Sequence, residues 1–200
     1  MGQYHVVVNT TKRQFMFPHK FGCGLKLMEF GCGGNIMTGL AILLATSNGQ
    51  GGGDLRSDNP IIGTWAGDNI LIAGDYADKT EKYSKAGGEG KYAFKKGDPC
   101  NWYDLCGEGD LEDISYKVMD ALADDEYMCQ DMRKSMSHFG ASKEMPATLK
   151  KKILAGWKQC TTCGSFGFRW VEQHLRTPCP DCKGTGFVPG NKQTREAFAQ

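Results

Sequence analysis

Four cysteines near the end of the chain constrain its fold more than any other feature of the sequence. They form two Cys-x2-Cys pairs with fifteen residues between the pairs, and they are Cys160, Cys163, Cys179 and Cys182. Each Cys-x2-Cys turn directs two sulfurs to one side, and two such turns complete a tetrahedron around Zn²⁺ with bonds of about 2.3 Å. Because four protein ligands leave no open coordination position, the spacing predicts a structural zinc ion and not a catalytic one.

The segment between the two cysteine pairs predicts a short β-hairpin. Phe166, Phe168 and Trp170 alternate with other residues, which is the period of a strand, and residues 165–177 are enough for two strands and a turn. A segment of this size lacks a core of its own, and bound zinc supplies folding energy instead. The sequence therefore predicts a small zinc-ribbon or zinc-knuckle module at residues 159–190, followed by a tail at residues 191–200.

Glycines follow both cysteine pairs. The second pair continues as Cys179-Pro180-Asp181-Cys182-Lys183-Gly184-Thr185-Gly186, and the first keeps Gly167 but has Ser165 at the place of the first glycine. The pattern Cys-x-x-Cys-x-Gly-x-Gly resembles the cysteine-rich zinc module of DnaJ-type chaperones over about residues 160–188. Two repeats stand where that family has four, and the chain has no His-Pro-Asp motif of a J-domain. The resemblance therefore implies the zinc module but no chaperone activity.

Charge is unevenly distributed between the body of the chain and its end. Residues 151–200 hold eight Lys/Arg and three Asp/Glu, a net charge of +5, whereas the first 150 residues hold 16 and 20, a net charge of −4. A basic end with aromatic residues suits contact with nucleic acid or with a host protein. The candidate contact residues are Lys158, Arg169, Trp170, Arg176 and Lys183. A module that only stabilises the end of the chain is the alternative.

The first 140 residues predict a glycine-rich α+β domain. A β-branched run predicts a first strand, an almost wholly apolar run predicts a buried helix, and two apolar runs around a polar turn predict a β-hairpin. These segments are, in order, Tyr4–Asn9, Met37–Thr46, and the pair Ile61–Trp65 and Ile70–Ala73. Residues 77–98 are polar and rich in glycine, so we expect an exposed excursion there.

Helical spacing dominates the chain after Asp110. Apolar residues recur every four positions in two runs, Ile114, Val118 and Leu122, then Met128, Met132, Met136 and Phe139. Asp124-Asp125 between the runs predicts a helix cap, and Gly140 predicts the end of the second helix. Pro146 predicts the first turn of a connecting helix at residues 141–158 that runs directly into Cys160. Its inner face would comprise Leu149, Ile153, Leu154 and Trp157.

Glycine clusters in the body supply a second candidate site, for a nucleotide or another anionic metabolite. Glycine loops allow close approach of a ligand, and their N–H groups bind anions. The candidate residues around them are His19, Lys20, Asp54, Arg56, Trp65 and Asp68. The simpler interpretation is that the glycines and aspartates form turns. The chain has no phosphate-binding P-loop, no dinucleotide-binding fingerprint and no nucleophile elbow, so we lean against an enzyme.

Part of the body resembles uncharacterised proteins of bacteria and their phages. The resemblance covers residues 1–78 and rests on the runs Pro18-His19-Lys20-Phe21-Gly22-Cys23-Gly24-Leu25-Lys26-Leu27 and Trp65-Ala66-Gly67-Asp68. It carries no known activity, but it implies a protein encoded by a phage or a mobile element.

The remaining cysteines indicate the compartment. Nine cysteines, an odd number with four in metal spacing, fit the reducing cytoplasm better than a disulfide framework. The other five match no common ligand spacing, so we expect buried thiols at Cys23, Cys32, Cys100, Cys106 and Cys129. No run approaches the roughly 20 apolar residues of a membrane span, so no membrane partner is expected. The sequence does not indicate an oligomeric state.

Two functions remain as hypotheses. The first is a non-enzymatic zinc protein that contacts nucleic acid or a host protein through its C-terminal module. The second is a protein that sequesters or hydrolyses a nucleotide or anionic metabolite in its glycine-rich domain. If the second is correct, the structure should bring His19, Asp54, Arg56 and Trp65 to one pocket.

Overall fold

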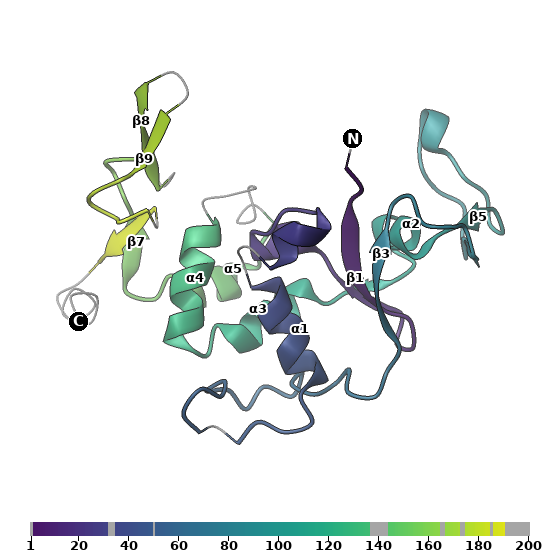
Figure 1. Ribbon diagram of the computed structural model, residues 1–200, viewed down its shortest axis with the longest axis horizontal. Helices are drawn as coiled ribbons and strands as arrows, with labels where there is room; N and C mark the ends of the chain where they lie inside the picture. Colours follow the sequence, from purple (N-terminus) through teal and green to yellow (C-terminus); the bar gives the residue numbers. More distant parts are fainter. Residues whose placement is uncertain are drawn as a thin grey trace.

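The protein has an α+β fold with a small four-cysteine module at its C-terminal end, as the sequence predicts (Figure 1). A computed structural model describes residues 2–31, 35–49, 51–136, 144–164, 167–172, 175–184 and 186–190. In this part of the chain, no helix is both long enough and apolar enough to cross a membrane.

A four-stranded sheet divides the body into two cores. Its strands are β1 (His5–Asn9), β2 (Gln14–Met16), β3 (Ile70–Gly74) and β6 (Glu112–Asp113), in the order β3-β1-β2-β6. β1 pairs antiparallel with β2 and β3, and β2 pairs parallel with β6. Val7 faces one core while Val6 and Val8 face the other. The β-branched run is therefore continuous because both faces of this strand are buried.

Helices cover the Val7 face of the sheet. They are the 3-10 turns η1 (Pro18–Phe21) and η2 (Leu27–Phe30), and the helices α1 (Ile36–Leu44), α3 (Ser115–Leu122), α4 (Glu126–Met136) and α5 (Ala147–Ile153). Gly39 lets α1 approach α3 closely, because a Cβ there would lie 2.9 Å from Cγ1 of Val118. Val118, Leu122 and Met132 are buried in this core, so the four-residue spacing does mark the inner faces of α3 and α4.

The opposite face is covered by α2 (Trp102–Gly107) and by a two-stranded ribbon. The ribbon strands are β4 (Glu81–Lys82) and β5 (Pro99–Cys100), and the excursion between them carries the 3-10 turn η3 (Gly90–Tyr92). A capping box starts α2, since the Asn101 side chain accepts from the Asp104 N–H at 2.9 Å and Asp104 accepts from the Asn101 N–H. The sequence does not predict α2, because six residues are too few for a clear period.

The predicted hairpin between residues 61 and 73 is wrong. Ile70–Gly74 is a strand, but it pairs with β1, and the real hairpin of the body is β1–β2. Residues 61–65 form turns that cap α1, because the N–H groups of Gly63 and Trp65 donate to the carbonyls of Ile42 and Leu43, each at 2.8 Å. The last carbonyls of a helix lack partners inside the helix, so this run satisfies them instead of pairing as a strand.

The predicted connecting helix is shorter than expected and does not reach Cys160. α5 ends at Ile153, Gly156 has a φ of 74°, and Trp157 begins the strand β7 (Trp157–Gln159). Arg133 fixes this junction. Its buried guanidinium donates to the Ile153 carbonyl at 2.7 Å, pairs with Glu126, and lies 4.3 Å from the Trp157 ring centroid. Gly140, the predicted end of α4, lies outside the described residues.

Candidate metal centre

The four predicted cysteine ligands converge at the centre of the C-terminal module. Their sulfurs all lie within 4.8 Å of one another, with Cys160 and Cys179 3.9 Å apart and Cys163 and Cys182 3.7 Å apart. A tetrahedron with metal–sulfur bonds of about 2.3 Å has edges of about 3.8 Å. The arrangement therefore has the dimensions of a tetrahedral four-thiolate site.

Two related turns build this site from opposite sides. Gly167 and Gly186 each stand seven residues after the first cysteine of their turn. The carbonyl of Gly186 accepts from the N–H of Cys160, and the carbonyl of Gly167 accepts from the N–H of Cys179, both at 2.9 Å. Each turn thus holds the first cysteine of the other, which gives the module an approximate two-fold symmetry that its sequence repeat anticipates.

Both glycines of this exchange adopt backbone conformations that other residues disfavour. Gly167 and Gly186 have φ values of 75° and 77°. At Gly167 a side chain is also excluded by space, because a Cβ would lie 2.3 Å from the carbonyl oxygen of Gly184. The glycine pattern after each cysteine pair is therefore a geometric requirement of the turns.

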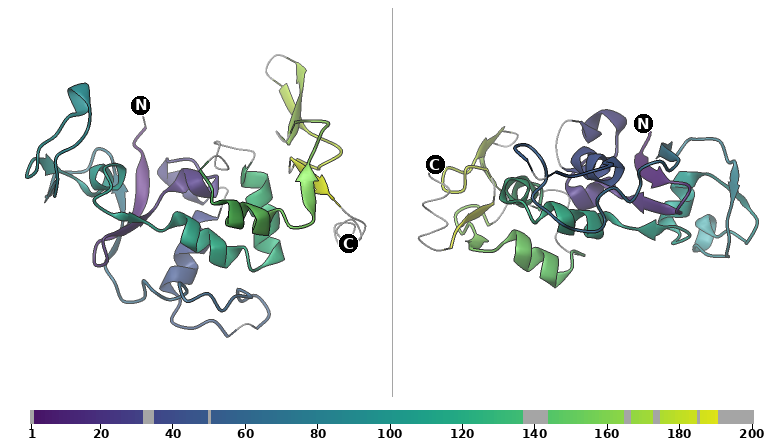
Figure 2. Two further views of the ribbon diagram at one scale, coloured as in Figure 1. Left: turned by 180° about the vertical axis from the view of Figure 1, so that it is seen from behind. Right: turned by 90° about the horizontal axis from the view of Figure 1, so that it is seen from below.

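Strands extend the module on both sides of the sulfurs. β7 pairs antiparallel with β10 (Phe187–Pro189), while β8 (Phe168–Glu172) and β9 (Leu175–Pro178) form the predicted hairpin arm (Figure 2). We call residues 157–190 the knuckle module. It begins at Trp157, so β7 belongs to the module and not to a connecting helix.

Burial and N–H donors set the acidity of the thiols. All four cysteines have less than a tenth of their surface exposed. Burial raises the pKa of Cys163 to about 12. Burial also acts to raise the pKa of Cys179, but N–H groups of Cys182 and Asp181 outweigh it and lower the value to about 7. The Gly186 N–H donates to the Cys182 sulfur at 3.3 Å. Buried thiolates with such donors fit a cation at their centre.

The site is closed and offers no catalytic group. Four sulfurs occupy all positions of a tetrahedron, and the described residues contain no other cluster of His, Cys, Asp or Glu with metal-binding geometry. Cys23, Cys100, Cys106 and Cys129 are buried cysteines of the body, as predicted, while Cys32 lies outside the described residues.

The candidate contact residues occupy the surface strands and turns of the knuckle module. Lys158 on β7 and Lys183 in the second cysteine turn are exposed. Trp170 of β8 and Arg176 of β9 are cross-strand partners, and Arg169 stands opposite Thr177. The backbone of the arm thus pairs Trp170 with Arg176, and Arg169 precedes Trp170 on β8, whereas their side chains lie outside the described structure.

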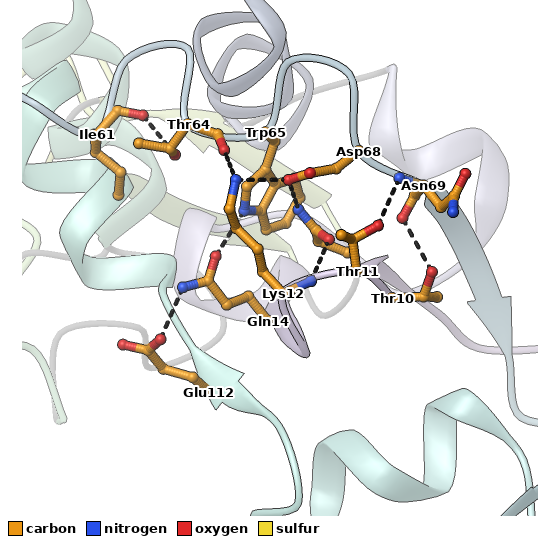
Figure 3. Close-up of polar contacts among 11 residues, drawn as sticks. Thr10, Thr11, Lys12, Gln14, Ile61, Thr64, Trp65, Asp68, Asn69 and Glu112 are labelled. Atoms are coloured by element: carbon orange, nitrogen blue, oxygen red, sulfur yellow. Dashed lines mark hydrogen bonds and ion pairs between the residues drawn. The ribbon is translucent and has the colours of Figure 1, made fainter.

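Trp65 and Asp68, two ligand candidates of the body, attach a loop to the β1–β2 hairpin (Figure 3). Trp65 has no exposed surface, and its indole N–H donates to Oε1 of Gln14 at 2.8 Å. Asp68 accepts from Lys12 at 2.7 Å and from Asn9 at 2.8 Å. We call these five residues the Trp65 network. The Trp65 ring is fully buried in the core, so it presents no exposed face to a ligand.

His19 and Lys20 lie in a second place, on η1. The His19 ring packs edge-on against Phe17 at 5.4 Å, and burial lowers the pKa of the imidazole although Glu29 acts to raise it. Lys20 pairs with Asp113 at 2.8 Å and lies 4.6 Å from the Tyr116 ring centroid. The Lys20 charge is thus already compensated by a carboxylate of the protein.

Asp54 and Arg56 lie in a third place, on the loop after α1. They border an open cavity of about 840 Å³ between α1, this loop and the start of α4. Asp54 closes a tight turn by accepting from the Gly51 N–H at 2.9 Å, and Arg56 is exposed. Three acidic residues at the start of α4, Asp124, Asp125 and Glu126, also border the cavity. Asp124 pairs with Lys152 at 2.6 Å and Glu126 pairs with Arg133, so two of these three charges are compensated within the protein.

The six candidates of the body therefore do not converge on one pocket, and they divide into three pairs with separate surroundings. Asp54 and Arg56 share the cavity beside α1. No protein-family model matches this chain, and no curated protein and no solved structure is significantly similar to it.

Proposed function

We propose that this protein binds one zinc ion through Cys160, Cys163, Cys179 and Cys182, and that the zinc-stabilised knuckle module binds a polynucleotide. The observation that carries the proposal is the tetrahedral set of buried sulfurs. Such a site folds its surroundings and performs no reaction, so the proposed activity is binding and not catalysis.

Zinc is the metal that best suits these ligands. Four thiolates in a tetrahedron are typical of zinc or of an iron site. Zinc lacks redox chemistry and stabilises small modules outright, which suits a module with so little apolar core. Metal analysis of protein purified from a zinc- and iron-containing medium tests this choice. One equivalent of zinc supports the proposal, and one equivalent of iron with its visible absorption contradicts it.

The surface of the knuckle module supports the choice of a polynucleotide. Lys158 and Lys183 are exposed, and the arm carries Arg169, Arg176 and Trp170 on paired strands. Cations bind phosphates, and an aromatic ring stacks on an unpaired base. The proposal also includes the resemblance of the two cysteine turns to the DnaJ-type zinc module. It does not include a chaperone activity.

The test is binding of zinc-loaded protein to labelled single-stranded and double-stranded oligonucleotides at increasing salt. We expect the logarithm of the affinity to fall linearly with the logarithm of the salt concentration. Lys158→Gln with Lys183→Gln should weaken binding and flatten that dependence, whereas Lys117→Gln, a lysine paired with Glu112 in the body, should leave it unchanged. Absence of binding at low salt to either nucleic acid contradicts the proposal.

A further inference from the structure

An ordered arm of the body projects from the end of the molecule opposite the knuckle module (Figures 1 and 2). We call residues 83–98, between β4 and β5, the lysine arm. The rings of Tyr83 and Phe94 stack at 3.8 Å with an interplanar angle of 18°, and Gly87 pairs with Phe94 across the arm. The Gly97 N–H donates to the Tyr83 carbonyl at 2.9 Å. The arm is therefore a folded structure with a defined surface.

Positive charge is concentrated at the tip of this arm. Residues 83–98 contain four lysines, Lys85, Lys91, Lys95 and Lys96, and two acidic residues, Glu89 and Asp98, which gives a net charge of +2. All four lysines are exposed. In the described part of the chain, none of their ammonium groups forms an ion pair with a carboxylate. Their charges are thus available to an anionic partner.

Apart from Glu89, the acidic groups near the arm lie at its foot. Ser84 bonds to Asp110, and burial together with Asp104, Glu108 and Asp110 raises the pKa of Tyr83 to about 12. The foot of the arm thus favours cations, while the tip favours anions.

An aromatic ring accompanies the lysines at the tip. Tyr92 is 72% exposed, and the Lys91 ammonium lies 4.8 Å from its ring centroid. An exposed tyrosine next to several lysines combines a stacking face with phosphate-binding charges, which is the composition of surfaces that bind single-stranded nucleic acid. Double-stranded nucleic acid keeps its bases stacked inside the helix and would leave this ring unused.

We propose that the lysine arm is a second polynucleotide-binding surface, with its lysines on successive phosphates and Tyr92 stacked on an unpaired base. The inference rests on the proposed function, polynucleotide binding, but it uses other residues at the other end of the molecule. One strand that contacts both ends binds more tightly than either contact alone, because the second contact forms at high effective concentration. The arm contains none of the metal ligands, so its contact does not require the metal.

The test uses full-length, metal-loaded protein and labelled oligo(dT), with affinity measured by anisotropy at several salt concentrations. Lys85→Gln/Lys91→Gln/Lys95→Gln/Lys96→Gln should reduce the salt slope by about 0.7 for each phosphate that is no longer neutralised. As a charge-matched comparison, Lys95→Gln/Lys96→Gln should weaken binding more than Lys79→Gln/Lys82→Gln, which removes two exposed lysines ahead of the arm. An unchanged slope in the fourfold variant overturns the inference.

Substitutions of Tyr92 distinguish the contribution of base stacking to the affinity from that of the lysine charges. Tyr92→Ala should weaken binding to oligo(dT) by about fivefold to a hundredfold with an unchanged salt slope, and Tyr92→Phe should retain most of the affinity because it keeps the ring. An abasic strand of equal length should be insensitive to Tyr92→Ala. If Tyr92→Ala weakens binding to the abasic strand as much as to oligo(dT), the stacking role is wrong.

This experiment distinguishes a failure of the arm inference from a failure of the proposed function. If Lys158→Gln/Lys183→Gln weakens binding and the arm variants do not, the arm inference is wrong and the proposed function remains. If only the arm variants weaken binding, the inference holds and the knuckle module is not the contact surface. If the arm variants lose binding to poly-glutamate or to phosphatidylserine vesicles but not to oligo(dT), the partner is not a polynucleotide and the inference is overturned.

Discussion

The knuckle module and the Trp65 network hold loops in place by different physical means. In the knuckle module, four buried sulfurs meet at one point, and among the described residues Val188 packs beside them while Phe187 packs into the core of the body. In the Trp65 network, a fully buried ring and the contacts of Asp68 with Lys12 and Asn9 attach a loop to the β1–β2 hairpin. The first arrangement is the proposed zinc site, whereas the second consists of side chains of the body alone. Loss of metal should therefore affect only one of them.

Removal of one cysteine of the proposed metal site should produce the largest difference in stability between the two regions. Cys179→Ser should abolish stoichiometric metal binding and unfold the knuckle module, because structural zinc contributes about 10 kcal/mol or more of apparent folding free energy. Amide hydrogen exchange should show much weaker protection in β7 and β10 and retained protection in β1 and β3. Cys100→Ala, at a buried cysteine of the body, should keep the metal. Unfolding of the whole chain in Cys179→Ser would show that the two regions are one cooperative unit.

Truncation of Trp65 should produce the opposite pattern. Trp65→Ala should lower the free energy of unfolding of the body by about 3–5 kcal/mol, because it leaves a large cavity in the core. The metal content of the knuckle module should not change. Trp65→Phe keeps a buried ring but removes the donor to Gln14, and a loss of about 1 kcal/mol is expected. Urea unfolding with metal analysis measures both effects, and metal loss in Trp65→Ala would contradict the separation.

Arg133 tests how the two regions are joined. Its guanidinium contacts the end of α5 and the first residue of the knuckle module, Trp157. Arg133→Met keeps much of the side-chain volume but removes the hydrogen bond to the Ile153 carbonyl, so we expect a loss of about 2 kcal/mol. Exchange protection in β7 should fall without loss of metal. Unchanged protection in β7 would mean that the knuckle module is positioned without this contact.

Acid should weaken the Trp65 network through Asp68, the smallest of these effects. Hydrogen bonds from Lys12 and Asn9 lower the pKa of Asp68 from its ordinary value of 3.8. A carboxylate with a lowered pKa in the folded state contributes stability above its unfolded pKa and loses it as the pH falls through the folded pKa. Asp68→Asn should thus be less stable than wild type above pH ~4, with a smaller loss below it. Asp78→Asn makes the same charge change on an exposed loop. Its stability relative to wild type should not change with pH in this range.

Parts of the fold with strong local signals could be predicted from the sequence. The cysteine spacing predicts the four-sulfur site, the period of Ile114, Val118 and Leu122 predicts α3, and the β-branched run predicts β1. These predictions succeed because each pattern specifies the structure of the same few residues that form it. In the four-sulfur site, the spacing of the cysteines also matches the fixed geometry of a tetrahedron. The hairpin arm of the knuckle module belongs to the same class.

Parts with distant partners could not be predicted. Ile61–Trp65 has the composition of a strand, yet it caps α1, and β6 is a two-residue strand whose partner β2 lies about a hundred positions earlier. The expectation that His19, Asp54, Arg56 and Trp65 share one pocket failed for the same reason. Glycine, aspartate and tryptophan occur both in ligand sites and in turns and cores, and only their neighbours in space distinguish these roles.

The sequence by itself predicted the four-cysteine cluster and the closed character of the proposed metal site, because both follow from residue types at short, fixed spacing. The backbone conformations that require Gly167 and Gly186 appeared only in the structure. The tertiary structure decided that Trp65 and Asp68 hold a loop, that Lys20 is paired with Asp113, and that the lysine arm stands exposed without ion pairs among the described residues. The physical reason is that burial and charge compensation depend on which segments meet in space, and some of the segments that meet here are about a hundred residues apart in the chain.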